Sequence, residues 1–310
     1  MISKSKDSET TDFIGDYLIN IFPSHNFNKY SHAIPIFKNK RPFFNFCIIG
    51  DRTGNPNDVI FKKVINTVRA MQPDFVICIG DLINGYSKSK KKINKEWNSL
   101  FGDLAEIHQP IFLVPGNHDI SNSIMEGIWL EKFGVTHYSF RFNNSLFLIM
   151  NSEDPPYEGE IEEWLNIKKI FHINPKFASN ILDKKYPSKI SLGQIDYIQK
   201  KLNENSDADW VYVFMHKPIW KNNINGFNFI EETLNDFNFT IFSGHKHRFK
   251  VNSNHLKNYI EIGSSGGGLH SNGATEGEYY QITWVSYSPG NSPIVTSIDI
   301  NGIKYISDNL

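Results

Sequence analysis

The sequence contains little cysteine and no long apolar run. Two cysteines in 310 residues, Cys47 and Cys78, are too few for a disulfide scaffold. Both lie inside apolar runs, where a thiol serves as a small apolar side chain, so we expect no structural disulfide. No run reaches the roughly 18 apolar residues that span a bilayer, and the first 22 residues lack the apolar core of a signal peptide. We therefore expect a cytoplasmic protein with no membrane partner.

The sequence also carries almost no net charge. A formal charge of -1 and an isoelectric point near 6.8 exclude a general attraction to nucleic acid or to anionic lipid. The basic run at residues 88–95 has no interleaved aromatic residues for base stacking, and we interpret it as a solvated face. Nucleic acid is therefore not expected as a partner, and any affinity for phosphate must come from local residues.

The length allows one large domain or two small ones, and the sequence shows no internal repeat and no linker between domains. Residues 1–40 are polar and then basic, and we interpret them as an N-terminal appendage. One domain is predicted over residues 41–310. An acidic and then basic segment at about 153–190, broken by prolines, is predicted to be an insert over one end of a sheet.

Apolar residues alternate between the patterns of buried strands and amphipathic helices. Strands are predicted at residues 43–50 and 74–80, and the helical spacing at 57–72 between them gives a β-α-β unit with a parallel pair. Further helices are predicted at residues 95–107, 123–133, 192–202 and 229–237. Further strands are predicted at residues 111–115, 138–142, 146–150, 210–215 and 239–244, with a hairpin turn at 143–144. The sequence therefore predicts an α/β fold.

Acid, amide and imidazole side chains follow five of these strands, at the point where each strand ends. These residues are Asp51, Asp81, Asn117, His216, His245 and His247. In open α/β sheets ligands bind at this edge. The mixture of ligand types suits Mn, Fe, Zn or Co better than the all-oxygen sites of Ca and Mg. Two such ions, bridged by a carboxylate about 3.5–4 Å apart, bind a phosphoryl oxygen and lower the pKa of a bridging water. The sequence therefore predicts two divalent transition metal ions in a hydrolase.

The order of the motifs resembles that of the calcineurin-like metallophosphoesterase family. The motifs, which span about residues 43–250, are Gly50-Asp51, Gly80-Asp81, Gly116-Asn117-His118-Asp119, a lone His216 and Gly244-His245-Lys246-His247. The resemblance implies a four-layer αββα fold, in which two mixed sheets pack face to face with flanking helices. It also implies a metal-dependent phosphoesterase, which hydrolyses a small-molecule phosphomonoester or phosphodiester with a metal-activated water.

The resemblance further implies a role for each motif residue. The implied ligands are Asp51 and His247 on the first ion, Asp81 as the bridge, and Asn117, His216 and His245 on the second ion. His118 is implied as the general acid. Its neighbour Asp119 is then expected to orient the His118 imidazole and to favour the protonated ring.

The first motif departs from the usual Asp-x-His pattern of the family. It reads Asp51-Arg52-Thr53-Gly54, so Thr53 replaces a histidine ligand, and the chain resembles a subgroup with an Asp-Arg-Thr-Gly start. Threonine is a poor metal ligand, and we expect a weak first site. Arg52 and Arg248 are predicted to bind the substrate phosphate, because a guanidinium presents paired donors to phosphate oxygens.

Two other functions remain open from the sequence. A non-catalytic metal-binding or scaffold protein that retains the fold is motivated by Thr53 at the ligand position. A nucleotide-type phosphodiesterase differs only in the pocket, which the 153–190 insert and the glycine loop at residues 263–268 are expected to shape. We interpret that glycine loop as a flexible loop near the site, because it lacks the Lys-Ser/Thr ending of a phosphate-binding P-loop.

Overall fold

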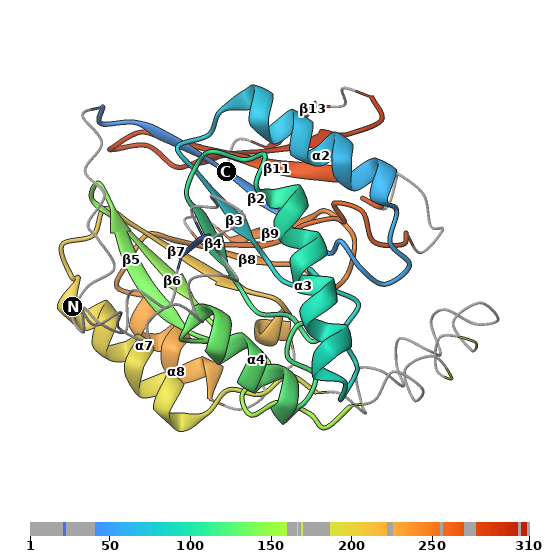
Figure 1. The fold of residues 1–310 in the computed structure, drawn as a ribbon. Coiled ribbons are helices and arrows are strands. Elements are labelled where there is room, and N and C mark those ends of the chain that lie inside the picture. The colour runs from blue at the N-terminus through green and yellow to red at the C-terminus, as the bar shows by residue number, and fades with distance from the viewer. Residues whose placement is uncertain are drawn as a thin grey trace, which may run out of the picture.

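The computed structural model describes residues 21–22, 41–159, 166, 169, 187–221, 226–254, 257–269, 277–302 and 305–308. Within these residues two mixed β-sheets pack face to face between two layers of helices (Figure 1). This is the four-layer αββα fold that the resemblance implies, and the fold prediction is confirmed.

The first sheet has seven strands in the order β1-β4-β3-β2-β11-β12-β13. Their bounds are β1 Ile21–Phe22, β2 Phe44–Ile49, β3 Phe75–Cys78, β4 Ile111–Leu113, β11 Gln281–Tyr287, β12 Ile294–Asp299 and β13 Tyr305–Asp308. The first four strands run parallel, whereas β11 lies antiparallel to β2 and the sheet continues antiparallel through β13. The predicted β-α-β unit therefore forms the parallel half.

The second sheet has six strands in the order β5-β6-β7-β8-β10-β9. Their bounds are β5 Tyr138–Phe142, β6 Ser145–Ile149, β7 Trp210–Met215, β8 Phe239–Ser243, β9 Lys250–Asn254 and β10 Lys257–Glu261. Strands β6, β7, β8 and β10 run parallel, and the two edge strands pair antiparallel. The predicted hairpin of β5 and β6 is present.

Side-chain caps set where most of the helices begin. The helices are α2 Asp58–Met71, α3 Lys90–Leu104, α4 Ser123–Phe133, α7 Leu192–Glu204 and α8 Phe227–Leu234, with a short 3-10 helix η2 at Ile219–Lys221. Helix α3 begins five residues before its predicted start, because the Ser89 side chain accepts a hydrogen bond from the Lys92 amide and caps the basic run. Helix α4 has the predicted bounds.

Three apolar cores separate the four layers. Between the sheets lies a core rich in phenylalanine, where the rings of Phe46 and Phe75 stack with centroids 5.2 Å apart. A second core joins the first sheet to α2, α3 and α4, and a third joins the second sheet to α7 and α8 (Figure 1). The second core contains both buried cysteines as free thiols, as expected. The many aromatic side chains thus fill the space between sheets.

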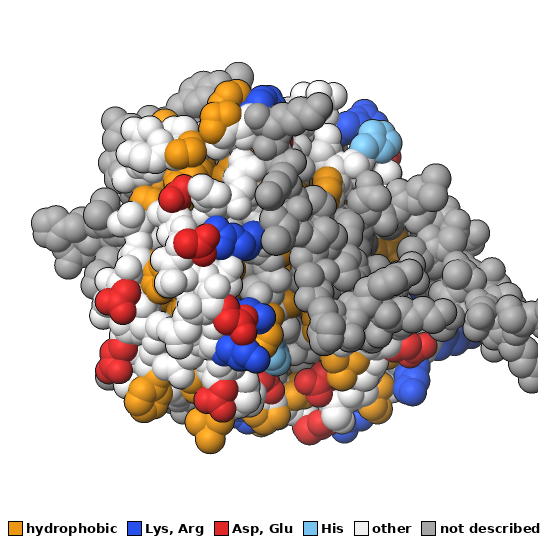
Figure 2. All heavy atoms as spheres, turned by 90° about the vertical axis from the view of Figure 1, so that its left-hand side faces the viewer, with side chains coloured by type: hydrophobic (Ala, Val, Ile, Leu, Met, Phe, Trp, Pro, Cys, Tyr) orange, Lys and Arg blue, Asp and Glu red, His pale blue; other side chains and the backbone are white. Residues whose placement is uncertain are grey.

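Two predicted segments lie mostly outside the described residues. Of the 1–40 appendage, Ile21–Phe22 is described, and it pairs with β4 at the edge of the first sheet. Of the 153–190 insert, the two ends are described, and Glu153 forms an isolated bridge with Lys189. Among the described residues no helix is long and apolar enough to cross a membrane. On the face drawn in Figure 2, acidic and basic side chains are interspersed.

Candidate metal centre

The predicted ligands meet where strands of both sheets end. Asp51 and Asp81 follow β2 and β3, and His216 follows β7 of the other sheet. The His216 Nε2 atom lies 3.2 Å from Asp81 Oδ2 and 4.0 Å from Asp51 Oδ1. His247 completes the cluster with Nε2 at 3.4 Å from Asp51 Oδ1. Polar groups distant in the sequence thus converge at one edge between the sheets.

One subset of this cluster has the geometry of a metal-binding group. Asp81, His216 and His245 each offer one ligand atom, and these three atoms lie within 4.8 Å of one another. Two ligands held at about 2.1 Å from one ion are about 3 Å apart, close to the 3.2 Å between His216 and Asp81. The separation therefore fits a shared ion.

Two buried atoms in the cluster lack a hydrogen-bond partner among the described residues. His216 directs Nδ1 to the Ile79 carbonyl at 2.9 Å, which leaves the buried Nε2 facing Asp81 as the nitrogen available to a metal ion. The Asn117 amide donates through Nδ2 to the Tyr86 hydroxyl at 2.9 Å, and its Oδ1 is unpartnered. A buried polar atom without a partner costs about 1–3 kcal/mol. The Asn117 oxygen and, once its proton is displaced, the His216 nitrogen are metal-ligating atoms, so the residues present fit divalent metal ions.

Four of the predicted ligands have a left-handed backbone. The φ angles are 49° at Asp51, 54° at Asp81, 71° at His245 and 50° at His247. Such angles are uncommon outside glycine, and each costs on the order of 1 kcal/mol or more unless surrounding structure imposes it. Their concentration at one edge indicates that the loops are shaped to aim side chains inward.

Electrostatics in the cluster follow from carboxylates and imidazoles buried together. Burial lowers the pKa of His216, but Asp81 and then Asp51 raise it to about 10. Burial raises the pKa of Asp81, yet the charges of His216 and His118 hold it well below its usual range. Burial and the charge of Lys246 lower the pKa of His245 well below its usual value. Asp81 is therefore an anion, and His216 takes a proton when no other cation neutralises it.

His118 lies beside the ligand cluster. Its amide donates to Asp81 Oδ1 at 2.9 Å, and its ring Nε2 lies 3.9 Å from Asp81 Oδ2. The ring Nδ1 is 2.7 Å from the Asn84 carbonyl, and the edge of the ring meets Tyr86 with centroids 4.8 Å apart. Burial lowers the pKa of His118, against the opposing charge of Asp81. His118 thus directs Nε2 to the cluster and releases a proton readily.

The expected role of Asp119 in orienting His118 is wrong. Both Asp119 oxygens accept hydrogen bonds from backbone amides, Oδ1 from Leu82 at 2.9 Å and Oδ2 from Gly116 at 2.9 Å. The group that fixes the His118 ring is instead the Asn84 carbonyl. Burial, together with the charge of Asp81, raises the pKa of Asp119 to about 7. Asp119 therefore ties the loop after β3 to the loop after β4.

Arg52 is not positioned to bind a phosphate at the cluster. Its guanidinium donates to the Leu82 carbonyl and pairs with Asp58 of α2 at 3.3 Å and Asp103 of α3 at 3.4 Å. The same group lies over the ring of Phe61, 4.9 Å from its centroid. The predicted phosphate role for Arg52 is therefore corrected to that of a link between two helices.

The second predicted phosphate ligand, Arg248, lies at the edge of the site. It follows His247 directly, and its guanidinium is 3.7 Å from the buried carboxylate of Glu261. Its side chain is 35% exposed, so it remains accessible to a solute.

Thr53, which replaces the usual histidine, has its own bond in the structure. Its hydroxyl donates to the Asn84 Oδ1 atom at 2.6 Å. The Asn84 side chain thus binds Thr53, and the Asn84 main-chain carbonyl binds His118. Thr53 therefore supports the position of His118.

Sequence reasoning missed Asn84 and Tyr86, which hold His118 and Asn117. The Asn84-Gly85 pair is a turn signal directly after a strand-end motif and was available in the sequence. A Cβ at Gly85 would lie 1.7 Å from the His118 carbonyl oxygen, so this turn requires glycine. Tyr86 has a φ of 46° and carries no comparable signal.

The glycine loop at residues 263–268 lies against the cluster, as expected, but its polar groups bind the protein. The Ser264 hydroxyl and the Gly267 amide both donate to the Asp51 carbonyl, at 2.8 and 2.6 Å. The Gly268 carbonyl accepts from His247 Nδ1 at 2.6 Å. Instead of the expected flexible segment, the described part of the loop is a bonded support for Asp51 and His247.

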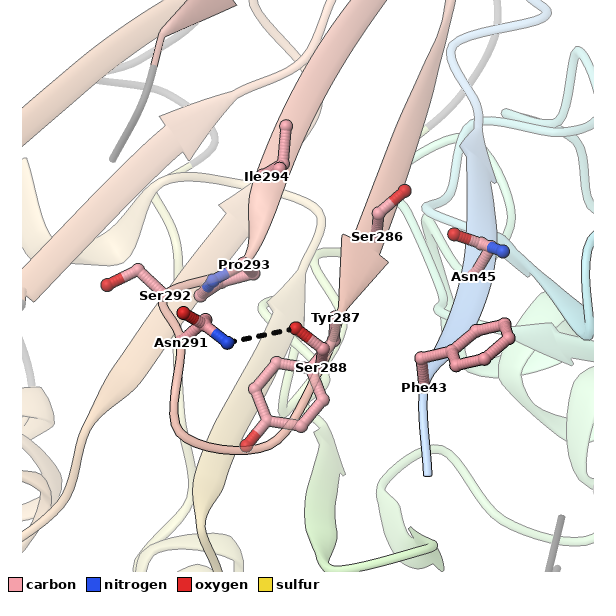
Figure 3. A pocket seen from close by; sticks show the side chains of 9 residues that line it. All are labelled: Phe43, Asn45, Ser286, Tyr287, Ser288, Asn291, Ser292, Pro293 and Ile294. Carbon is pink, nitrogen blue, oxygen red and sulfur yellow. Dashed lines mark hydrogen bonds between the residues drawn. The ribbon is translucent and has the colours of Figure 1, made fainter. Parts of the chain in front are cut away.

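A separate pocket of about 630 Å³ lies at the other end of β2 (Figure 3). It is lined by Phe43 and Asn45 at the start of β2 and by the turn between β11 and β12, where Asn291 donates to the Ser288 hydroxyl at 3.2 Å. Its lining has no ionisable group suited to metal binding. The pocket is therefore distinct from the metal cluster.

Comparison with known proteins decides the family. The profile of the calcineurin-like phosphoesterase family matches residues 44–249. The chain belongs to this family. The matched region of this calcineurin-like phosphoesterase contains every predicted metal ligand, the Arg52 and Arg248 positions and His118.

Individual relatives of this calcineurin-like phosphoesterase are distant. Tartrate-resistant acid phosphatase type 5 of mouse is 24% identical over 200 residues, which cover 58% of this chain and 57% of the mouse protein. The chain thus spans little more than half the length of the curated relatives that it matches, the mouse and rat proteins.

Solved structures show the same fold. A dimetal phosphatase of Danio rerio superposes with a TM-score of 0.57 at 13% identity, covering 86% of this chain and 99% of that one. GAP50, described as the anchor in the inner membrane complex of Plasmodium, superposes with a TM-score of 0.58 at 15% identity, covering 87% and 89%. At these identities the likeness concerns the fold alone.

Proposed function

We propose that this calcineurin-like phosphoesterase hydrolyses a phosphomonoester or a phosphodiester with the help of two divalent transition metal ions. The observation that supports this most is the convergence of Asp81, His216 and His245 beside the unpartnered oxygen of Asn117. Asp51 and His247 would hold the first ion, Asp81 would bridge, and Asn117, His216 and His245 would hold the second. When bound, the ions supply Lewis acidity toward the phosphoryl oxygens and lower the pKa of a water molecule.

His118 would act as the general acid for the leaving oxygen. The Asn84 carbonyl accepts from Nδ1, so Nε2 is the nitrogen that would face the reacting phosphate and, in the doubly protonated ring, would carry the proton to be transferred. Because burial lowers the pKa of His118, its proton passes readily to a developing alkoxide. Asp119 and the Asn84-Gly85 turn would keep the His118 ring beside Asp81, because they fix the loop after β3 to the loop after β4.

The protein fits a phosphatase better than a scaffold, because the groups that serve turnover accompany the ligands. A scaffold needs ligands alone, whereas here His118 is placed within 3.9 Å of Asp81, with its tautomer fixed by the Asn84 carbonyl. The position of Thr53 does not argue against catalysis, since its hydroxyl supports the loop that fixes His118.

The test is hydrolysis of p-nitrophenyl phosphate and bis-p-nitrophenyl phosphate by metal-loaded protein. We expect turnover that a chelator removes and Mn²⁺ restores, and the ratio of the two rates would assign monoester or diester preference. Asp81→Asn should abolish turnover. Asp207→Asn, at a 73% exposed carboxylate paired with Arg141, is the matched control and should retain it. Metal-loaded protein that is inert toward both esters and a wider phosphoester panel would contradict the proposal.

A further inference from the structure

A second group of charges lies at the same edge, outside the ligand cluster. Glu261 ends β10, and the parallel pairing of β10 with β8 places it opposite Ser243, two residues before His245. Lys221 ends η2, five residues after His216. Arg248 directly follows His247. The strand register and the short loops therefore bring a carboxylate and two cations to the rim of the metal centre.

The buried carboxylate holds the two cations in place. Glu261 is fully buried, and its Oε1 lies 2.5 Å from the Lys221 Nζ atom. Its Oε2 lies 3.7 Å from the Arg248 guanidinium, which is beyond hydrogen-bond distance. The Lys221 and Arg248 side chains remain 29% and 35% exposed. Glu261 thus positions both cations without covering them.

Positive charge exceeds negative charge in this group. Glu261 supplies one negative charge against the two positive charges of Lys221 and Arg248. Burial lowers the pKa of Lys221, whereas the negative charge of Glu261 raises it. The positive charges of Arg248 and Lys246 lower it further, so both cations are close enough to act on Lys221. The Arg248 Nε atom is buried and makes no hydrogen bond to the described residues. An excess of positive charge on partly exposed side chains favours an anionic ligand.

We propose that Lys221 and Arg248 form a second anion subsite beside the metal centre, and that the substrates are phosphoesters with a second phosphate group. This inference rests on the proposed function, since the reacting phosphate is taken to lie at the metal cluster. Glu261 is a positioning residue, because it acts through the two cations. The second phosphate would lie between the exposed ends of Lys221 and Arg248, where the guanidinium supplies directed donors and the ammonium a compact charge.

The test compares cleavage of the 6-phosphate ester in two sugars, measured as release of glucose 1-phosphate from glucose 1,6-bisphosphate and of glucose from glucose 6-phosphate. Glucose 1,6-bisphosphate and glucose 6-phosphate differ by one phosphate, and we expect kcat/KM to favour the bisphosphate by about tenfold or more. Lys221→Ala and Arg248→Ala should each lower kcat/KM for the bisphosphate by about 10- to 100-fold more than for the monophosphate. Arg69→Ala, which removes an exposed arginine paired with Glu106 at 3.0 Å, is the matched control and should keep the preference.

The outcomes separate this inference from the proposed function. Wild-type protein that hydrolyses both esters equally well would overturn the subsite while leaving the phosphoesterase intact, and this result depends on no variant. If neither sugar ester is hydrolysed, the p-nitrophenyl esters and the wider panel decide the proposed function, and calorimetry on Mn²⁺-loaded protein still tests the subsite. In that case inorganic pyrophosphate should bind at least about tenfold more tightly than phosphate, with the difference lost in Arg248→Lys and Lys221→Met. Equal affinity for pyrophosphate and phosphate would overturn the proposed subsite.

Discussion

At the scale of single residues, three of the four histidines of the site share one arrangement. His118, His216 and His247 each place Nδ1 against a main-chain carbonyl, at 2.7, 2.9 and 2.6 Å. A carbonyl accepts but does not donate, so Nδ1 carries the proton and Nε2 points to the cluster. The carbonyl partners are Asn84, Ile79 and Gly268 respectively. The fold therefore fixes which nitrogen of each ring faces the cluster before any ligand arrives.

The raised pKa of His216 predicts how metal affinity depends on pH. With a pKa of about 10 in the metal-free protein, His216 is protonated at neutral pH, and an ion that binds Nε2 must displace that proton. Apparent affinity should therefore rise with pH, by about tenfold per unit between about pH 6 and pH 8 for one displaced proton. Calorimetry with Mn²⁺ in buffers of different ionisation enthalpy measures the protons released. Affinity that stays constant over this range, with no proton release, would contradict the assignment of His216 as a ligand.

His118→Asn tests the general acid. A poor leaving group such as phenoxide needs a proton, so kcat for phenyl phosphate should fall by about 10²- to 10⁴-fold. The p-nitrophenolate ion leaves with little help, and kcat for its ester should fall much less. His108→Asn, at an exposed histidine beyond α3, serves as the control. An equal loss for the two esters would show that His118 acts on something other than the leaving oxygen.

At the scale of elements, the glycines between strand and ligand decide how closely the loops approach. A Cβ on Gly116 would lie 2.4 Å from the Asp81 amide nitrogen, and one on Gly244 would lie 2.6 Å from Asp51 Oδ2. Both glycines directly precede ligand residues. The motifs need glycine there because each loop packs closely against a ligand carboxylate, Asp81 at Gly116 and Asp51 at Gly244. Gly244 thus gives room for the Asp51 carboxylate.

Gly116→Ala should disrupt the site, because the atoms in the way are backbone and a buried carboxylate. We expect loss of metal-dependent turnover and a decrease of about 1–3 kcal/mol in the free energy of unfolding, measured by denaturant titration. Gly127→Ala is the matched control, since Gly127 lies inside α4 and a Cβ there meets nothing within 4 Å. It should raise the free energy of unfolding by about 0.5–1 kcal/mol through helix propensity and leave turnover unchanged. Full activity in Gly116→Ala would refute the account of the loop contact.

Much of the element pattern was predictable from the sequence. The strands before Asp51 and Asp81, the β5–β6 hairpin and helix α4 follow from apolar spacing and turn residues alone. The grouping of Asp51, Asp81 and Asn117 also followed, since parallel strands of one sheet end at one edge, whereas their meeting with the histidines depends on how the two sheets pack. The partners of Asp119 and Arg52 did not, because they are backbone amides and helix carboxylates brought close only by tertiary packing. Contacts of this kind leave no periodic signal in a single sequence.

At the scale of the whole molecule, the four layers explain why the site lies where it does. Each sheet is covered on both faces, so polar loops can gather only at the sheet ends. The first sheet supplies Asp51, Asp81 and Asn117, and the second supplies His216 and His245. The metal centre therefore forms only when the two sheets pack together, and bound metal should in turn stabilise that packing.

The central claim is that this edge between the sheets is a metal centre that hydrolyses phosphoesters. The most direct measurement takes metal-stripped protein, titrates it with Mn²⁺, and determines bound Mn²⁺ per chain and the rate of p-nitrophenyl phosphate hydrolysis on the same samples. The account predicts no hydrolysis without metal and a rate that rises with the bound Mn²⁺. A rate that does not follow the bound metal, or stoichiometric metal without turnover, would contradict it, and the second result would favour the scaffold function.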